Sequence, residues 1–179
     1  MNAALLEALF ATEAPAHLGP ARRPGVWSAG VASAQAATLC ADARLTGRPA
    51  ECLRALVLLW HDHLDEAHGL VQDLAGGDAA WVHGIMHRRE PDYSNARYWF
   101  HRVGAHAACE SLAEAAAPVL AAHPAPPHRL IREGRWDPFA FIDAVAARAR
   151  GEAAIPEVDL LRELQRIETL VLARHLAEG

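Results

Sequence analysis

Residues 50–75, AECLRALVLLWHDHLDEAHGLVQDLA, decide the fold class of this chain. Apolar residues recur in this stretch at steps of three and four, which is the spacing of one face of an α-helix. The apolar stripe comprises Leu53, Leu56, Val57, Trp60, Leu64, Ala67, Val71 and Leu74. The spacing therefore predicts one long helix over residues 50–75, with a broad face that needs other helices to cover it.

Glycine and proline divide the rest of the chain into further segments of helical periodicity. Gly76 and Gly77 end the long helix, Asp78 is the expected N-cap of the next one, and Pro91 ends that helix in turn. The other predicted helices cover about residues 2–11, 28–45, 78–90, 93–103, 106–122, 138–150 and 156–177.

Two segments rich in proline and glycine, near residues 13–27 and 123–136, are predicted to be irregular. A loop as long as the first one is unusual in a compact domain and often covers something. No stretch is suited to separate two domains, so residues 1–179 are expected to form a single all-α domain. Its architecture is expected to be a bundle or an orthogonal packing of about six to eight helices.

Composition agrees with this fold class and restricts the partners. Apolar residues make up 52% of the chain and aromatic residues 6%, and alanine, the best helix former, is abundant. The net charge of -5 argues against a nucleic-acid partner, and no apolar run approaches the roughly 20 residues that span a membrane. An odd number of cysteines, three, favours a reducing compartment, so we expect a cytoplasmic protein, with a homo-oligomer left open.

Polar chemistry concentrates in residues 61–106, which hold seven of the eleven histidines. On the predicted long helix, His61, Asp65 and His68 share a strip that borders the apolar stripe, whereas Asp62 falls on the solvent side. This strip is expected to form one wall of a functional site.

The following helix carries a second strip of the same kind. His83, His87 and Glu90 are spaced i, i+4 and i+7 and share one of its sides. The short connection at Gly76 and Gly77 makes the two helices neighbours, so the two strips can converge. Imidazole nitrogens and carboxylate oxygens bind divalent transition metals such as zinc. The expected metal ligands are His61, His68, His83, His87 and Glu90.

The start of the helix after Pro91 is the second candidate element of the site. A helix N-terminus offers free N–H groups and a positive dipole end, and together with arginines it binds carboxylate or phosphate groups. The residues expected to hold a small anionic molecule are Arg88, Arg89, Tyr93, Asn95, Tyr98 and Arg102. The arginines beside Glu90 and Asp92 can instead form structural ion pairs, and the sequence leaves both interpretations open.

The block AWVHGIMHRREPDYSNARYWFHRVGAH, preceded by LLWHDHLDEAH, resembles a family of uncharacterised proteins that carry nearly the same block. The resemblance covers roughly Leu56 to His106, under a third of the chain. It implies that the block acts as a unit and implies no particular reaction.

These patterns lead to two alternative functions. In the first, the His, Asp and Arg side chains of residues 61–106 form a pocket for a metal ion or a small anion, and the protein is a metal-assisted hydrolase. The catalytic residues would then be His61, Asp65, His68 and His87. In the second, the protein is not an enzyme, and the polar block is a ligand-sensing pocket or a buried hydrogen-bond network that fixes the helix crossings.

Overall fold

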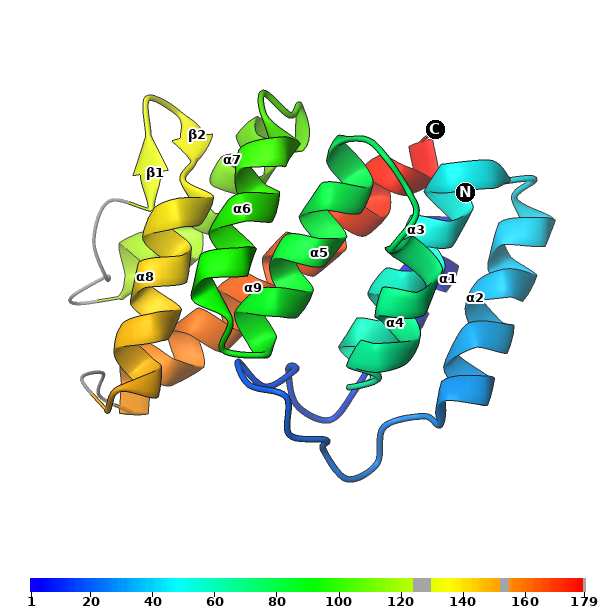
Figure 1. The fold of residues 1–179 in the computed structure, drawn as a ribbon, viewed down its shortest axis with the longest axis horizontal. Helices are drawn as coiled ribbons and strands as arrows, with labels where there is room; N and C mark the ends of the chain where they lie inside the picture. The colour runs from blue at the N-terminus through cyan, green and yellow to red at the C-terminus, as the bar shows by residue number, and fades with distance from the viewer. Residues whose placement is uncertain (124–129, 152–154, 179) are drawn as a thin grey trace.

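The computed structural model describes residues 1–123, 130–151 and 155–178, and it confirms the all-α fold (Figure 1). Within these residues the chain forms nine helices and one small hairpin. The helices are α1 (Ala3–Ala8), α2 (Ala29–Asp42), α3 (Gly47–Trp60), α4 (Leu64–Val71), α5 (Gly77–Arg89), α6 (Tyr93–Val103), α7 (Ala108–Ala122), α8 (Pro138–Ala149) and α9 (Ile155–Glu178). The count exceeds the expected six to eight because one predicted helix is divided in two.

Side-chain caps fix where several of these helices begin. Ser28, Asp92 and Asp137 stand at the N-caps of α2, α6 and α8, and each side chain accepts a hydrogen bond from a first-turn backbone N–H. The expected N-cap at Asp78 is wrong, because Gly76 occupies that position and Asp78 lies inside the first turn of α5.

The predicted single helix over residues 50–75 is also wrong. Helix α3 ends at Trp60 and α4 begins at Leu64, and between them the backbone of Asp62 has a φ of 66°, in the left-handed region. Asp62 is therefore buried, not on the solvent side, and its carboxylate accepts hydrogen bonds from the side chains of Arg23 and Arg89. The chain turns here so that this carboxylate meets two cations from elsewhere in the sequence.

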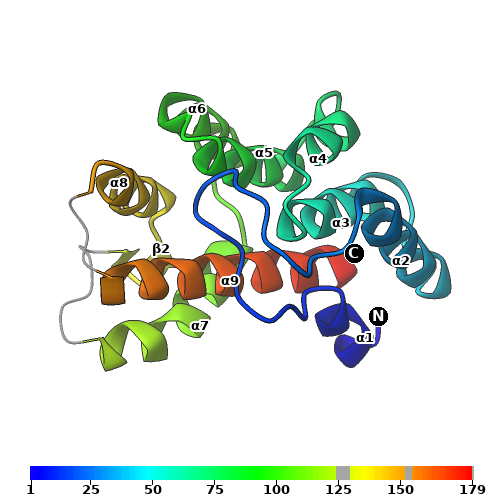
Figure 2. The ribbon, with the colours of Figure 1, turned by 90° about the horizontal axis from the view of Figure 1, so that it is seen from below.

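Helix α9 is the element around which the others are arranged. It contacts α1, α3, α7 and α8 along its length, while α5 packs against α3, α4 and α6 (Figures 1 and 2). One hydrophobic core contains buried side chains from every one of these helices, among them Trp60 of α3, Trp81 of α5 and Phe141 of α8. No helix in the described part of the chain combines the length and apolar character needed to cross a membrane.

The irregular segment between α1 and α2 is fixed to the helices that it crosses. The Gln165 side chain donates hydrogen bonds to the carbonyls of Ala16 and His17, at 3.2 and 3.1 Å, and Arg162 donates to the carbonyl of Pro15 at 2.8 Å. Figure 2 shows this loop running across α9 toward α5. The loop thus covers the junction of these helices, as its length led us to expect.

The second segment expected to be irregular, near residues 123–136, contains a short antiparallel hairpin. Strand β1 (Ile131–Arg132) pairs with β2 (Arg135–Trp136), and the ring of Trp136 is buried against Phe141. Residues 124–129, the rest of that prediction, lie outside the described residues.

The contact between α5 and α6 depends on a missing side chain at Gly84. A Cβ atom there would lie 2.5–2.9 Å from three ring carbons of Phe100, which is itself buried. Gly84→Ala should therefore lower the free energy of unfolding by about 1–3 kcal/mol, because the ring has to move within a packed core. Urea denaturation measures this change.

Gly69, in the interior of α4, supplies the matched control. A Cβ at Gly69 meets no atom within 4 Å, so Gly69→Ala should stabilise the protein by up to about 1 kcal/mol through helix propensity alone. Equal effects of the two substitutions would contradict the assigned packing of Phe100.

Candidate functional site

The polar block of residues 61–106 is divided among separate places in the structure. Residues 61–63, between α3 and α4, hold the N-terminal loop. His68, His83 and His87, here called the histidine cluster, lie together where α4 and α5 meet. His106 lies in a third place, beside the start of α5 and the end of α9.

His61 and His63 bind the N-terminal loop and face away from the other predicted ligands. Nδ1 of His61 accepts the N–H of Trp27 at 3.2 Å, which leaves its Nε2–H to donate to the carbonyl of Leu9 at 3.0 Å. The His61 ring also stacks on the Trp27 indole, with 4.5 Å between centroids, and His63 donates to the Trp27 carbonyl at 2.8 Å. Both nitrogens of His61 are occupied, so it is a structural residue in this arrangement.

The histidine cluster brings together three rings from two helices. The centroid of the His68 ring lies 5.5 Å from that of His83 and 6.0 Å from that of His87, and the centroids of His83 and His87 are 6.2 Å apart. Helix α5 presents His83 and His87 one turn apart, and α4 brings His68 to face them. The predicted convergence of the two helices thus unites these three residues, while His61 and Asp65 lie outside the group.

His83 is fully buried and has one nitrogen without a partner. Its Nδ1–H donates to the carbonyl of Ala79 at 2.9 Å, and its ring lies flat on Trp99, with centroids 3.9 Å apart. Nε2 therefore carries a lone pair, and no described residue forms a hydrogen bond with it. Burial lowers the pKa of His83, and the nearby His68 and His87 lower it further against the opposing effect of the Ala79 carbonyl. A neutral imidazole with one tautomer fixed by a backbone carbonyl is the form that binds metal ions.

His87 is held in the same way by a carboxylate. Its Nδ1–H donates to Oε2 of Glu90 at 2.9 Å, so Nε2 is again the nitrogen with the lone pair. That Nε2 accepts a hydrogen bond from the side-chain N–H of Asn95, on α6, at 3.2 Å, so both nitrogens of His87 have partners and a metal ion bound there would replace the Asn95 bond. A carboxylate–histidine pair of this kind orients a metal ligand and raises its basicity. Glu90 and Asn95, both predicted site residues, thus lie next to the cluster.

The three rings are spaced somewhat more widely than in a metal centre, and their ligand atoms do not all lie within 4.8 Å of one another. Three imidazoles bound to one tetrahedral zinc ion, each with a nitrogen about 2.1 Å from it, place their ring centres about 5 Å apart. The observed centroids are 5.5, 6.0 and 6.2 Å apart. Because His68 is only half-buried, at the edge of the cluster, a change in its rotamer can shorten its distances to the other two rings, whereas the longest distance, between His83 and His87, lies within α5.

A cavity and a cation lie beside the cluster. Arg102 is exposed on α6, with its guanidinium 5.5 Å from the centre of the Trp99 ring on which His83 stacks. A cavity of about 300 Å³ is lined by Leu74, Ala75, Gly76, Trp99 and Arg102. Arg102 therefore places a positive charge where a small anion would approach this side of the molecule.

A different set of side chains has the shortest spacing between potential ligand atoms. Among the described residues, Asp78, His106 and His175 form the one group of three whose ligand atoms all lie within 4.8 Å of one another. Nδ1 of His106 accepts the N–H of Ala108 at 3.2 Å, so its Nε2–H donates to Asp78 at 3.0 Å. This hydrogen bond lowers the pKa of Asp78 despite burial. Every nitrogen of His106 is used, and the group is satisfied as a hydrogen-bonded set.

The remaining predicted site residues have other positions. Asp65 is exposed on α4, and Tyr98 is 53% exposed on α6, where Arg102 lies over its ring. Arg88 and Arg89 are fully buried and form ion pairs with Glu168 and Asp62, so they do not face the histidine cluster. Of the two interpretations of these arginines, the structural ion pairs are present. Their acidic partners are Glu168 and Asp62, however, and not the neighbouring Glu90 and Asp92.

Several polar residues escaped the sequence reasoning. Arg23 lies in the irregular loop and Glu168 in the middle of the α9 apolar pattern, yet each is buried and pairs with a charge far away in the chain. No local signal in the sequence marks either of them. The stacking of Trp99 on His83 was not predicted either, although Trp99 lies inside the block from Leu56 to His106.

No protein-family model, no curated protein and no solved structure matches this chain. The resemblance of the block from Leu56 to His106 to an uncharacterised family therefore stays a prediction.

Proposed function

We propose that this protein binds a transition metal ion, zinc being the best fit, through His68, His83 and His87. The observation that carries the proposal is the buried Nε2 of His83, which has a lone pair and no hydrogen-bond partner among the described residues. A buried polar atom without a hydrogen-bond partner destabilises a fold by about 1–3 kcal/mol. A metal ion bound to this nitrogen would remove that cost.

The surroundings of the cluster support a chemical use of the ion. With three imidazole ligands, a bound zinc ion would keep a fourth position for water or substrate, and it would supply the Lewis acidity found in catalytic centres. Glu90 and the Ala79 carbonyl orient two of the ligands, and the exposed Arg102 supplies a positive charge beside Trp99, the ring on which His83 stacks. A metal-assisted hydrolysis of a small anionic substrate is the reaction class that these groups serve best.

Zinc titration of the purified, chelator-treated protein tests the proposal. We expect one zinc ion per chain, and a loss of affinity of about 100-fold or more in His83→Ala, because one of three ligands and its lone pair are removed. His68→Ala should have a similar effect, and as a half-buried edge residue it leaves the core intact. Binding should weaken as pH falls, since protons compete for the imidazoles.

His175→Ala is the matched control, since it removes a half-exposed histidine from the Asp78 group and leaves the histidine cluster unchanged. It should bind zinc as tightly as the unmodified chain. If His175→Ala loses the ion while His68→Ala and His83→Ala keep it, the metal lies at Asp78 and the proposal is wrong. Absence of binding at about 100 µM zinc would also overturn it.

A further inference from the structure

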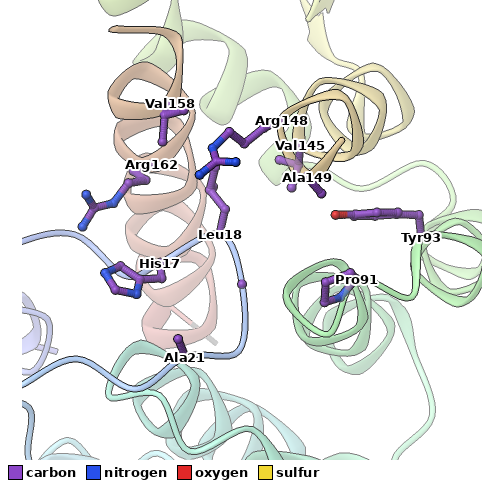
Figure 3. Close-up of a pocket in the computed structure, with 11 residues that line it drawn as sticks. His17, Leu18, Ala21, Pro91, Tyr93, Val145, Arg148, Ala149, Val158 and Arg162 are labelled. Atoms are coloured by element: carbon purple, nitrogen blue, oxygen red, sulfur yellow. The ribbon is translucent and has the colours of Figure 1, made fainter. Parts of the chain in front are cut away.

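A second cavity, on a different part of the molecule, has the composition of a ligand site. Its volume is about 370 Å³, within the range of about 300–1,000 Å³ that small-molecule sites occupy. Four segments of the chain build its walls: the N-terminal loop, the connection between α5 and α6, the end of α8 and the start of α9 (Figure 3). Its lining includes His17, Leu18, Tyr93, Val145, Arg148 and Arg162.

The polar part of this cavity is cationic. Arg148 reaches from the end of α8 toward α9 (Figure 3), and its guanidinium forms no hydrogen bond or ion pair with any residue that the structure describes. Arg162 donates through Nη2 to the Pro15 carbonyl, while its buried Nε has no hydrogen-bond partner in the described ranges. Among the described lining residues there is no carboxylate. Nη1 of Arg162 lies 3.9 Å from Oδ1 of Asp159, a 72% exposed acid outside the wall, so the charge of Arg148 is the one that no described acid pairs with.

Two further groups in the wall can donate hydrogen bonds without adding charge. Burial raises the pKa of the Tyr93 hydroxyl, although the charges of Arg150, Arg148 and Arg88 oppose that effect. Tyr93 therefore keeps its proton and extends its hydroxyl toward the loop (Figure 3). Burial and the charge of Arg162 lower the pKa of His17, which is consequently neutral at pH 7.

The rest of the wall is apolar. Leu18, Val145 and Val158 come from three different segments and face the same space. A bare inorganic ion would leave these side chains in contact with water, whereas an organic group would bury them. The site thus combines a charged end with an apolar one, which fixes the chemical class of its ligand.

We infer that the cavity bounded by Tyr93, Arg148 and Arg162 binds a small organic anion, a carboxylate or a phosphate monoester with an apolar body. Guanidinium groups form short, charge-assisted hydrogen bonds with both kinds of head group, at about 2.7–2.9 Å. The apolar body then lies against Leu18, Val145 and Val158. This site is separate from the histidine cluster and does not depend on metal binding there.

Calorimetric titration with simple probes tests this inference. Phenyl phosphate and benzoate represent the two head groups with the same apolar body, phenol lacks the charge, and inorganic phosphate lacks the body. We expect at least one of the two aromatic anions to bind, and to bind about tenfold or more tightly than phenol or inorganic phosphate. The preferred head group distinguishes a carboxylate ligand from a phosphate ester.

Substitutions then assign the binding to this cavity. Arg148→Met should weaken the better probe about tenfold or more, and because Arg148 is exposed the variant should fold normally, as its thermal melting curve will show. Tyr93→Phe should weaken it by a smaller factor. Arg44→Met is the matched control, since it removes the same charge from an exposed position after α2, at the opposite end of the molecule from α8 (Figure 1).

Three results would overturn the inference. The first is no binding of either aromatic anion at millimolar concentration. The second is an equal loss in Arg148→Met and Arg44→Met, which would mean that net charge alone is responsible. The third is equal affinity for the better of the two aromatic anions and for inorganic phosphate, which would mean that the apolar wall contributes nothing.

Discussion

Replacing Asp62 with glycine is expected to lower the free energy of unfolding by about 3–5 kcal/mol, because two buried guanidinium groups lose their counter-charge. Oδ2 of Asp62 lies 2.8 Å from Nε of Arg23 and Oδ1 lies 2.7 Å from Nη2 of Arg89. These arginines are only 6% and 1% exposed, so water cannot replace the carboxylate. Glycine accepts the φ of 66° at this position, so the measured loss in urea denaturation is that of the side chain.

Two comparisons isolate the ion pairs. Asp62→Ala should be less stable than Asp62→Gly by about 1–2 kcal/mol, because alanine is strained in the left-handed region. Asp65→Ala, which removes an exposed carboxylate three residues away, should change stability by at most about 1 kcal/mol. A loss below 1 kcal/mol in Asp62→Gly would contradict the burial of the ion pairs.

The same ion pairs make the stability of the protein depend on pH in the acidic range. Burial alone would raise the pKa of Asp62, but the hydrogen bonds from Arg23 and the charge of Arg89 outweigh it, and the pKa lies below its usual value. Because the folded pKa is depressed, the stabilisation is complete above the unfolded value of about 3.9 and is lost as pH falls through the folded pKa. The Asp62→Gly variant should lack this part of the acid dependence.

The break at Asp62 also explains what the sequence could not predict about the fold. The helical segments and most of their ends follow from periodicity, glycine, proline and caps, and the structure confirms them. Nothing between Leu58 and Leu64 is a helix breaker, so local reasoning continues the helix. The turn is instead stabilised by Arg23 and Arg89, which are 39 and 27 residues away along the chain. Tertiary contacts of that kind override local propensity.

The part of the candidate site that lies on a single helix, α5, was predictable from the sequence. The i, i+4 spacing of His83 and His87 survives because α5 is a regular helix, and Gly76 and Gly77 bring α4 alongside it. The place of His61 was not predictable, because its angular position was derived from a helix that ends at Trp60. His61 thus lies at the C-cap of α3 and turns toward the N-terminal loop.

The two arginines that end α5 show a second limit. A pair of arginines followed by Glu90 is typical of a solvated helix end, yet Arg88 and Arg89 are both buried. Their counter-charges, Glu168 and Asp62, come from α9 and from the α3–α4 junction, on different sides of α5. Helix α5 is consequently buried from Ala79 to Arg89 and fixed by two ion-pair networks. Such fixation holds His83 and His87 in place, which a metal centre requires.

The ion pair between Arg88 and Glu168 predicts a large loss of stability when Glu168 is replaced. This residue is fully buried on α9, and its carboxylate accepts hydrogen bonds from Arg88 and, at 3.1 Å, from the indole N–H of Trp81. Glu168→Met keeps a similar volume but leaves Arg88 charged and unpaired inside the core. We expect a loss of about 3–5 kcal/mol in the free energy of unfolding, measured by urea denaturation.

A double-mutant cycle with Arg88→Met separates the ion pair from packing. Arg88→Met alone should also cost about 3–5 kcal/mol, since it leaves a buried carboxylate beside the Phe141 ring on which the guanidinium lies. The double variant contains no buried charge at this place, so it should be more stable than Glu168→Met even though Trp81 loses its acceptor. If the two single losses simply add, Arg88 and Glu168 are not coupled, and α5 must be attached to α9 by its apolar contacts alone.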